Sequence, residues 1–147
     1  MGTVKTKSRG AWEDRFHIPS PEELLEGLPA NVRGRVMQLR TQLASTTGAR
    51  EYMQWLGPWG WVFVYRTPKC NGVAKAYIVP DPERPRVCLP AAEHAIAAAG
   101  EKAISKAARE VVASSPAVDG VRWAVWDVET KEAAQDAIKF AAACCSK

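Results

Sequence analysis

The residues of this chain best suited to recognising another molecule are its tryptophans. The chain holds six, and three of them, Trp55, Trp59 and Trp61, fall within the segment WLGPWGW. An indole ring is large and amphipathic, and it is enriched at binding surfaces as well as in cores. Exposed rings can stack on a planar ligand, hold a cation against their π faces, or bury against a second subunit. The sequence therefore predicts either an aromatic binding surface or an aromatic core in this segment.

The alternation of residue types after this segment decides which aromatic rings share a surface. In a β-strand Trp61, Phe63 and Tyr65 point to one side of the sheet. The Asn-Gly dipeptide that follows predicts a β-hairpin. A strict two-residue turn pairs Tyr65 with Ile78, whereas a one-residue bulge pairs it with Tyr77. The sequence leaves both registers open, and it also leaves open whether helices cover this aromatic face.

The leading hypothesis is a small non-enzymatic protein that binds a planar or apolar small molecule through this aromatic sheet face. A homodimer that buries the same face is the alternative in the interaction class. The candidate ligand-binding residues are the aromatic side chains around the hairpin and one nearby cation: Trp55, Trp59, Trp61, Tyr65, Lys75 and Tyr77.

Signals for catalysis are weaker. The chain carries no phosphate-binding loop, dinucleotide fingerprint, HExxH zinc motif or GxSxG elbow. His94 beside Glu93 could serve as a general base, but no nucleophile is paired with it by a known pattern. Carboxylates at expected strand ends and in loops, including Glu51 and Asp127, cannot be placed at a catalytic separation. We therefore predict no catalytic residue, no metal ligand and no cofactor, and an enzyme of unknown reaction is the less favoured class.

The cysteines indicate the compartment. The chain has four, with no CxxC spacing, and Cys144 and Cys145 are adjacent. This is neither a disulfide framework nor a zinc pattern, so we expect reduced thiols in a cytoplasmic protein.

Charge and hydropathy limit the partners. The 147-residue chain has a net charge of +4, and half of that excess lies in residues 1–20. This is short of the basic footprint of a nucleic-acid-binding domain, so no nucleic-acid partner is expected. No apolar run is long enough to span a membrane, and the amino-terminal residues do not have the pattern of a signal peptide.

The periodicity predicts a flexible arm at 1–17 and a single α+β domain at 18–147. Ser20 and Glu23 form the pattern of a helix capping box, and a longer helix follows Pro29. Strands are expected at 51–56, 59–66, 73–79, 86–89 and 121–128, and helices at 90–114, divided near Gly100, and 131–145. This order predicts a largely antiparallel sheet of about five strands with helices mainly on one face: helix, four-strand meander, helix, strand, helix.

Three segments resemble one bacterial protein family. They are GPWGWVFVYR, YIVP and DGVRWAVWDVETKEAAQDAIK, and they contain Gly60, Trp61, Tyr65, Pro80 and Gly120. Together they resemble the domain of unknown function family 3788, within the wider YdhG-like group, over about residues 18–145. The resemblance implies an α+β fold.

Part of the YdhG-like group is described as frataxin-like iron chaperones. An iron chaperone requires an acidic surface ridge. The acidic cluster here consists of Glu22, Glu23 and Glu26, in a chain that is basic overall, which disfavours iron delivery.

Overall fold

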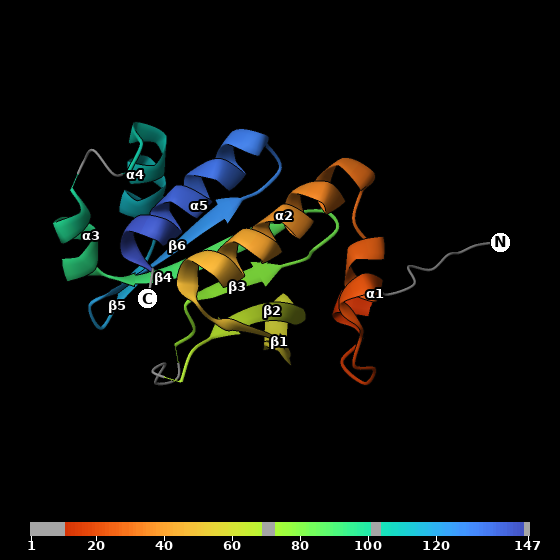
Figure 1. The fold of residues 1–147 in the computed structure, drawn as a ribbon. Helices are drawn as coiled ribbons and strands as arrows, with labels where there is room; N and C mark the ends of the chain where they lie inside the picture. Colours follow the sequence, from red (N-terminus) through yellow and green to blue (C-terminus); the bar gives the residue numbers. More distant parts are fainter. Residues whose placement is uncertain (1–10, 69–72, 101–103, 146–147) are drawn as a thin grey trace.

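The computed structural model describes residues 11–68, 73–100 and 104–145 as one open antiparallel sheet with helices packed on it (Figure 1). Six strands lie in the order β1-β2-β3-β4-β6-β5, and every neighbouring pair is antiparallel. The predicted α+β class and the antiparallel sheet are confirmed. The described elements are η1 (Ala11–Glu13), α1 (Pro21–Glu26), α2 (Ala30–Thr47), β1 (Arg50–Trp55), η2 (Gly57–Trp59), β2 (Trp61–Arg66), β3 (Ala76–Val79), β4 (Arg86–Ala92), α3 (Glu93–Ala99), α4 (Lys106–Ala113), β5 (Ala117–Val118), β6 (Val121–Asp127) and α5 (Lys131–Cys144).

Local sequence signals explain the first two helices. Ser20 Oγ accepts a hydrogen bond from the Glu23 amide at 3.2 Å, and the Glu23 carboxylate accepts one from the Ser20 amide at 2.9 Å. This is the predicted capping box, which satisfies amide groups that a helix amino-terminus leaves without partners. In α2 the apolar stripe is buried against the sheet and consists of Val32, Val36, Leu39 and Leu43.

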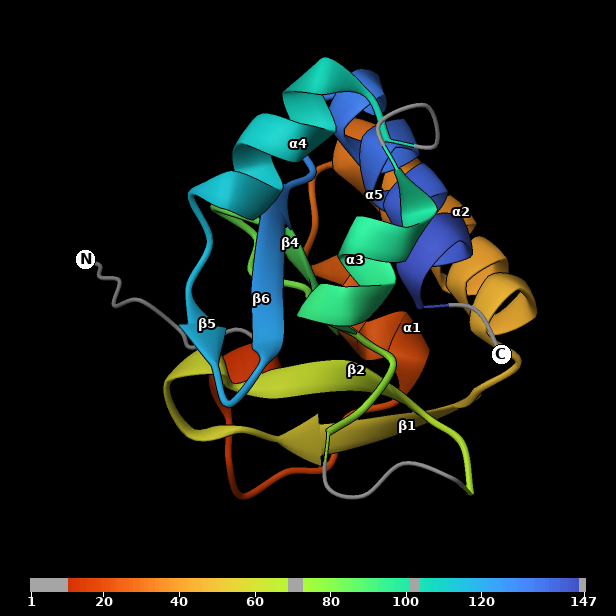
Figure 2. The same cartoon turned by 90° about the vertical axis from the view of Figure 1, so that its left-hand side faces the viewer.

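The helices cover one side of the sheet. Helices α2 and α5 lie side by side across it, and the view in Figure 2 shows β1 and β2 crossing β6 steeply, as expected of a strongly twisted sheet. Alanines at 134, 137 and 141 of α5 are buried, so this helix approaches the sheet closely. Small helix residues here face large strand residues, which is complementary packing.

The register between β2 and β3 differs from both registers considered from the sequence. Tyr65 pairs with Ala76 and Phe63 pairs with Ile78. A two-residue turn would pair Tyr65 with Ile78, so the observed pairing is shifted by two residues along β3. Side chains of a strand alternate between faces with a period of two, so this shift leaves each side chain of β3 on the face that the two-residue turn predicts. The Asn71-Gly72 dipeptide that suggested the turn lies outside the described residues.

The aromatic face of β2 lies in the main core. Trp61 is 7% exposed, and Phe63 and Tyr65 are fully buried beneath the helices. Trp61, Phe63 and Tyr65 therefore form part of an aromatic core rather than an exposed binding surface. The opposite face of the sheet holds a second, smaller cluster of buried residues: Val62, Val64, Ala74, Tyr77, Val79 and Cys88.

Strand β4 is longer than the sequence suggested, and the expected helical segment 90–114 begins later. Pro90 and Ala91 pair with Trp123 and Arg122 of β6, so the chain stays extended as far as Ala92. Tertiary pairing outweighs the helix propensity of the alanines here. The two-residue strand β5, which extends the sheet by pairing with β6, was not predicted.

The part of the predicted arm that the structure describes is docked. Trp12 packs against the main core, and the Trp61 indole Nε1 donates to the Asp14 carbonyl at 2.7 Å. Phe16, by contrast, is 92% exposed. Gly60 makes this docking possible, because its φ is +72° and a Cβ atom there would lie 2.3 Å from the Trp12 carbonyl oxygen.

We expect Gly60→Ala to destabilise the fold by about 2 kcal/mol, since it combines backbone strain at positive φ with the clash against Trp12. Urea unfolding followed by circular dichroism measures the change. Gly34→Ala is the matched control, because nothing lies within 4 Å of a Cβ at this helical position. It should stabilise the protein by about 0.5–1 kcal/mol. Equal effects of the two substitutions would contradict this account.

Candidate functional site

The predicted ligand-binding residues divide between the two faces of the sheet. Trp61 and Tyr65 lie under the helices, and Trp55 meets Trp61 edge to face at 5.9 Å on the same side. Trp59 and Tyr77 lie on the opposite, helix-free face. The structure therefore does not bring the expected set together on one surface.

Lys75 belongs to neither aromatic group. It is half-buried, and its amide donates to the Tyr65 carbonyl at 2.8 Å. Its charge acts on the thiol of Cys145, which follows α5 on the helix side of the sheet.

Three aromatic rings form a continuous row on the helix-free face, which we call the aromatic row: Trp59, Tyr77 and Trp123. The Trp59 and Tyr77 rings meet nearly edge to face at 6.0 Å, and the Tyr77 and Trp123 rings lie 6.1 Å apart at an interplanar angle of 33°. Tyr77 is 6% exposed and forms the centre, whereas both tryptophans are half-buried and keep part of their surface open. Such pairs of rings are rigid and present apolar surface at low cost in side-chain entropy.

Neighbouring elements hold the aromatic row in place. The turn η2 carries Trp59 back over the sheet, and the Leu56 amide donates to the Gly60 carbonyl at 2.9 Å to close the β1–β2 connection. The Tyr77 hydroxyl accepts a hydrogen bond from the Ala74 amide at 3.2 Å. These contacts fix the orientation of two of the three rings without a ligand.

Sequence reasoning did not place Trp123 in this group. The alternation in the sixth strand indicates that Trp123 and Val125 share a face, but not which residues lie beside them. Their neighbours depend on the strand order, in which β4 separates β3 from β6. That order is set by pairing between segments far apart in the chain.

A second group of polar side chains links α2 to the sheet: Arg40, Glu51 and Tyr65. The Arg40 guanidinium donates to both oxygens of Glu51, from Nε at 2.9 Å and from Nη2 at 2.7 Å. The Tyr65 hydroxyl donates to Glu51 Oε2 at 2.6 Å. Arg40 also lies 4.7 Å above the Phe63 ring, a cation–π contact.

The pKa values in this group follow from their mutual hydrogen bonds. Burial raises the pKa of Glu51, but the hydrogen bonds from Arg40 and Tyr65 outweigh it and leave that pKa below its ordinary value. The hydrogen bond to Glu51 raises the pKa of Arg40. Burial, together with the bond to Glu51, raises the pKa of the Tyr65 hydroxyl well above its usual range, so it stays protonated. The arrangement joins helix to sheet as a closed network, in which every member has a partner.

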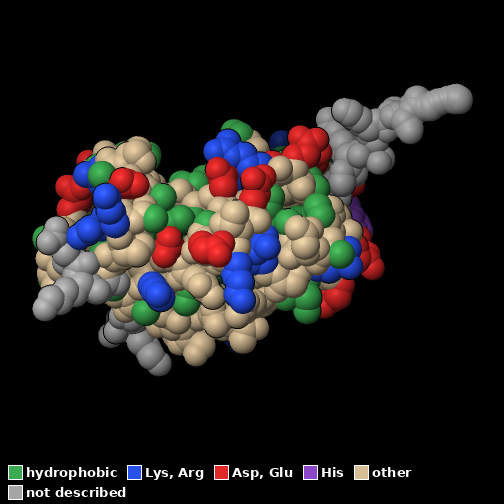
Figure 3. Space-filling view, turned by 90° about the horizontal axis from the view of Figure 1, so that it is seen from above, with side chains coloured by type: hydrophobic (Ala, Val, Ile, Leu, Met, Phe, Trp, Pro, Cys, Tyr) green, Lys and Arg blue, Asp and Glu red, His purple; other side chains and the backbone are tan. Residues whose placement is uncertain are grey.

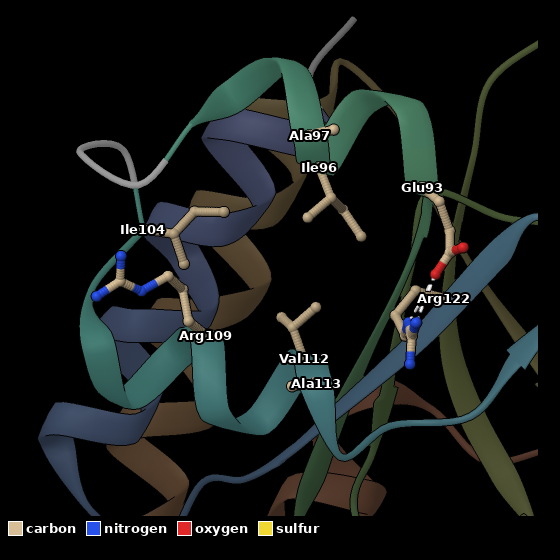
Figure 4. A pocket seen from close by; sticks show the side chains of 8 residues that line it. All are labelled: Glu93, Ile96, Ala97, Ile104, Arg109, Val112, Ala113 and Arg122. Atoms are coloured by element: carbon tan, nitrogen blue, oxygen red, sulfur yellow. Dashed lines mark hydrogen bonds and ion pairs between the residues drawn. The ribbon is translucent and has the colours of Figure 1, made fainter.

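A hollow of about 370 Å³ lies between α3 and α4 (Figure 4). Its walls are mainly apolar, and the Glu93–Arg122 ion pair lies at one end. The hollow is separate from the aromatic row, none of whose residues line it. Its lining residues are Glu93, Ile96, Ala97, Ile104, Arg109, Val112, Ala113 and Arg122.

The other residues considered for chemistry are not assembled into a site. His94 is exposed, and His17 pairs with Glu23 at 3.1 Å, beside the capping box. Over residues 11–68, 73–100 and 104–145, no group of three or more His, Cys, Asp or Glu side chains could hold a metal ion. No helix in these same ranges is long and apolar enough to cross a membrane.

The face above the helices carries both signs of charge. Figure 3 shows basic and acidic side chains interleaved on this face. Between α2 and α5, a groove of about 380 Å³ is lined by Arg35, Lys131 and Lys139 among neutral residues. A polyanion footprint requires a broad field of one sign. The view in Figure 3 does not show such a field on this side of the molecule.

Searches against protein-family models, curated proteins and solved structures found no match for this chain. The resemblance to the domain of unknown function family 3788 therefore stays a prediction.

We expect Glu51→Gln to lower the free energy of unfolding by about 2 kcal/mol at pH 7, because Arg40 loses its charged partner. The stabilisation by Glu51 is complete above the ordinary glutamate pKa of about 4.3 and is lost as the pH falls through the lower pKa of the folded protein. The difference between wild type and variant, measured by urea unfolding, should therefore shrink between pH 7 and pH 3. A difference that stays constant over this range would refute the role of the ionised carboxylate.

Cysteine reactivity gives a further prediction. Burial raises the pKa of the Cys88 and Cys145 thiols to about 12 and also raises the pKa of Cys144. The thiolate is the reactive form, so a native Cys70→Ser protein should react slowly with a disulfide reagent such as DTNB at pH 8. All three remaining thiols should react at once in urea. Fast labelling of Cys88 or Cys145 in the native protein would show that these positions are not buried.

Proposed function

We propose that this protein is a non-enzymatic binding protein for a small planar or apolar ligand, and that the ligand stacks on the aromatic row. The observation that carries the proposal is the contiguity of Trp59, Tyr77 and Trp123 on a face without helices. Aromatic rings in contact, with part of their surface open, offer π faces and apolar area to a planar molecule. Two of the three belong to the set predicted from the sequence.

The aromatic row is suited to binding rather than to catalysis. Apolar residues surround it, including Val62, Val64 and Val125. General acid–base or nucleophilic catalysis requires a titratable group within hydrogen-bonding distance of the reacting atoms. Two titratable groups in this buried cluster are unsuited to catalysis: the Tyr77 hydroxyl is engaged with the Ala74 amide, and burial raises the pKa of the Cys88 thiol to about 12. This favours recognition of an apolar surface.

A homodimer through the same face is the second candidate. Partly open tryptophans are enriched in protein–protein interfaces as well as in ligand sites.

The described cysteines are free thiols, which supports our placing of the protein in a reducing, cytoplasmic compartment. Iron delivery is the less favoured proposal, because Glu23 of the acidic cluster is engaged with Ser20 and His17.

The test is a titration of the protein with a set of planar heteroaromatic fragments, followed by NMR of the indole N–H signals. We expect the signals of Trp59 and Trp123 to shift. Either Trp59→Ala or Trp123→Ala should weaken binding about 5- to 150-fold, which corresponds to the loss of one stacking contact of about 1–3 kcal/mol. Trp55→Ala is the matched control, since it removes an indole from the opposite face.

Two outcomes would count against ligand binding at the aromatic row. One is the absence of any fragment-induced shift at Trp59 and Trp123. The other is an equal loss of affinity in the Trp55→Ala control. A dimer whose dissociation in light scattering is promoted by Trp123→Ala would support the interface instead.

A further inference from the structure

The groove between α2 and α5 has the properties of a site for a small anion. Its volume of about 380 Å³ falls within the range of about 300–1,000 Å³ usual for ligand pockets. Leu39 and Ala134 line it and belong to the main core, so the floor of the groove is part of the packed interior. The two helices lie side by side on the face of the sheet opposite the aromatic row (Figure 1).

Three cations line the groove, and no acidic residue lines it with them: Arg35, Lys131 and Lys139. Arg35 Nη1 donates to the carbonyls of Val128 and Glu129 at 3.1 and 2.7 Å. These neutral acceptors fix the guanidinium group and leave its charge unbalanced. Lys131 and Lys139 form no hydrogen bond or ion pair within the part of the chain that the structure describes. The groove therefore carries a local positive charge.

Acidic side chains near the groove do not cancel this charge directly. Glu129 and Glu132 are exposed and do not line the groove. Asp136 of α5 accepts a hydrogen bond from Ser105 Oγ at 3.1 Å, next to the start of α4. The wider face above the helices carries both signs of charge (Figure 3). The positive lining is thus confined to the groove, which suits a small anion rather than a long polyanion.

The cations lie at the two ends of the groove. Arg35 and Lys131 mark one end, because Arg35 contacts the carbonyls of the residues that immediately precede the N-cap of α5 and of the residue before that cap. Lys139 lies about 12 Å further along the axis of α5, since each helical residue rises about 1.5 Å. Amide groups can both donate and accept hydrogen bonds, which suits a ligand with hydroxyl groups. Three of them line the groove: Gln38, Gln42 and Gln135.

We propose that this groove binds a phosphorylated polyol of the size of a sugar phosphate. The phosphate lies toward Arg35 and Lys131, and the hydroxyl groups of the body face the glutamine amides. A phosphate monoester carries a charge of about −1.5 to −2 near neutral pH, so it gains more from several cations than a single carboxylate does. The groove shares no residue with the aromatic row, so either proposal can fail without the other.

The test uses three probes that separate the two parts of the ligand: glucose 6-phosphate, glucose and inorganic phosphate. NMR of the side-chain amides of Gln38 and Gln135 and of the Ile138 methyl groups reports binding at low salt and neutral pH. We expect glucose 6-phosphate to bind about fivefold more tightly than inorganic phosphate, because the amides add hydrogen bonds to the hydroxyl groups. Glucose should bind most weakly, and added salt should weaken glucose 6-phosphate more than glucose.

Charge variants with matched controls test the location. Lys131→Gln should weaken glucose 6-phosphate about fivefold, whereas Lys106→Gln, an equal change at an exposed residue of α4, should leave its affinity unchanged. Gln135→Glu places a negative charge in the groove without changing the size of the side chain, and it should also weaken binding about fivefold. Asn31→Asp is its control, because Asn31 is exposed on α2 and does not line the groove. Circular dichroism confirms that each variant is folded.

The proposal is overturned if glucose 6-phosphate shifts none of these signals, or if glucose or inorganic phosphate binds as tightly as glucose 6-phosphate. It is also overturned if Lys106→Gln weakens binding as much as Lys131→Gln, or if Asn31→Asp weakens it as much as Gln135→Glu.

Discussion

The structure depends on the burial of β2 on both of its faces. From Trp61 to Tyr65 every side chain of this strand is buried, although helices cover only one side of the sheet. On the helix side, α2 and α5 exclude water from Trp61, Phe63 and Tyr65. On the other side, the strand's valines must be covered by side chains of the sheet itself and of its connections. The aromatic row is the result of this second requirement.

The same constraint explains why polar atoms near β2 are paired. Tyr65 brings a hydroxyl into the main core, where an unsatisfied group costs free energy. Glu51 accepts its hydrogen bond, and Arg40 in turn balances the charge of Glu51. Three elements, α2, β1 and β2, are thereby fixed relative to one another. The Trp61 indole uses the docked segment before α1 in the same way, by donating to the Asp14 carbonyl.

The aromatic row and the hollow between α3 and α4 differ in physical character. The aromatic row is a surface of rings that already contact one another, so a ligand there gains stacking area without filling a cavity. The hollow between α3 and α4 is a concave space with mainly apolar walls and the Glu93–Arg122 ion pair at one end. The first arises from covering the helix-free face of the sheet. The second lies between the short helices α3 and α4, where the Glu93–Arg122 pair joins α3 to β6 and residues 97 and 113 are alanines.

The sequence by itself determined the class of fold and several of the local elements. The capping box at Ser20, the apolar stripe of α2 and the alternation in β2 each depend on residues a few positions apart, where short-range geometry controls the outcome. The tertiary structure alone decided which face of β2 the helices cover. Because β2 is apolar on both sides, its alternation defines two faces but gives no amphipathic signal to choose between them. Three other features likewise depend on contacts between segments that are separate in the chain, which local patterns do not encode. They are the place of Trp123 in the aromatic row, the ion pair between Arg40 and Glu51, and the hollow between α3 and α4.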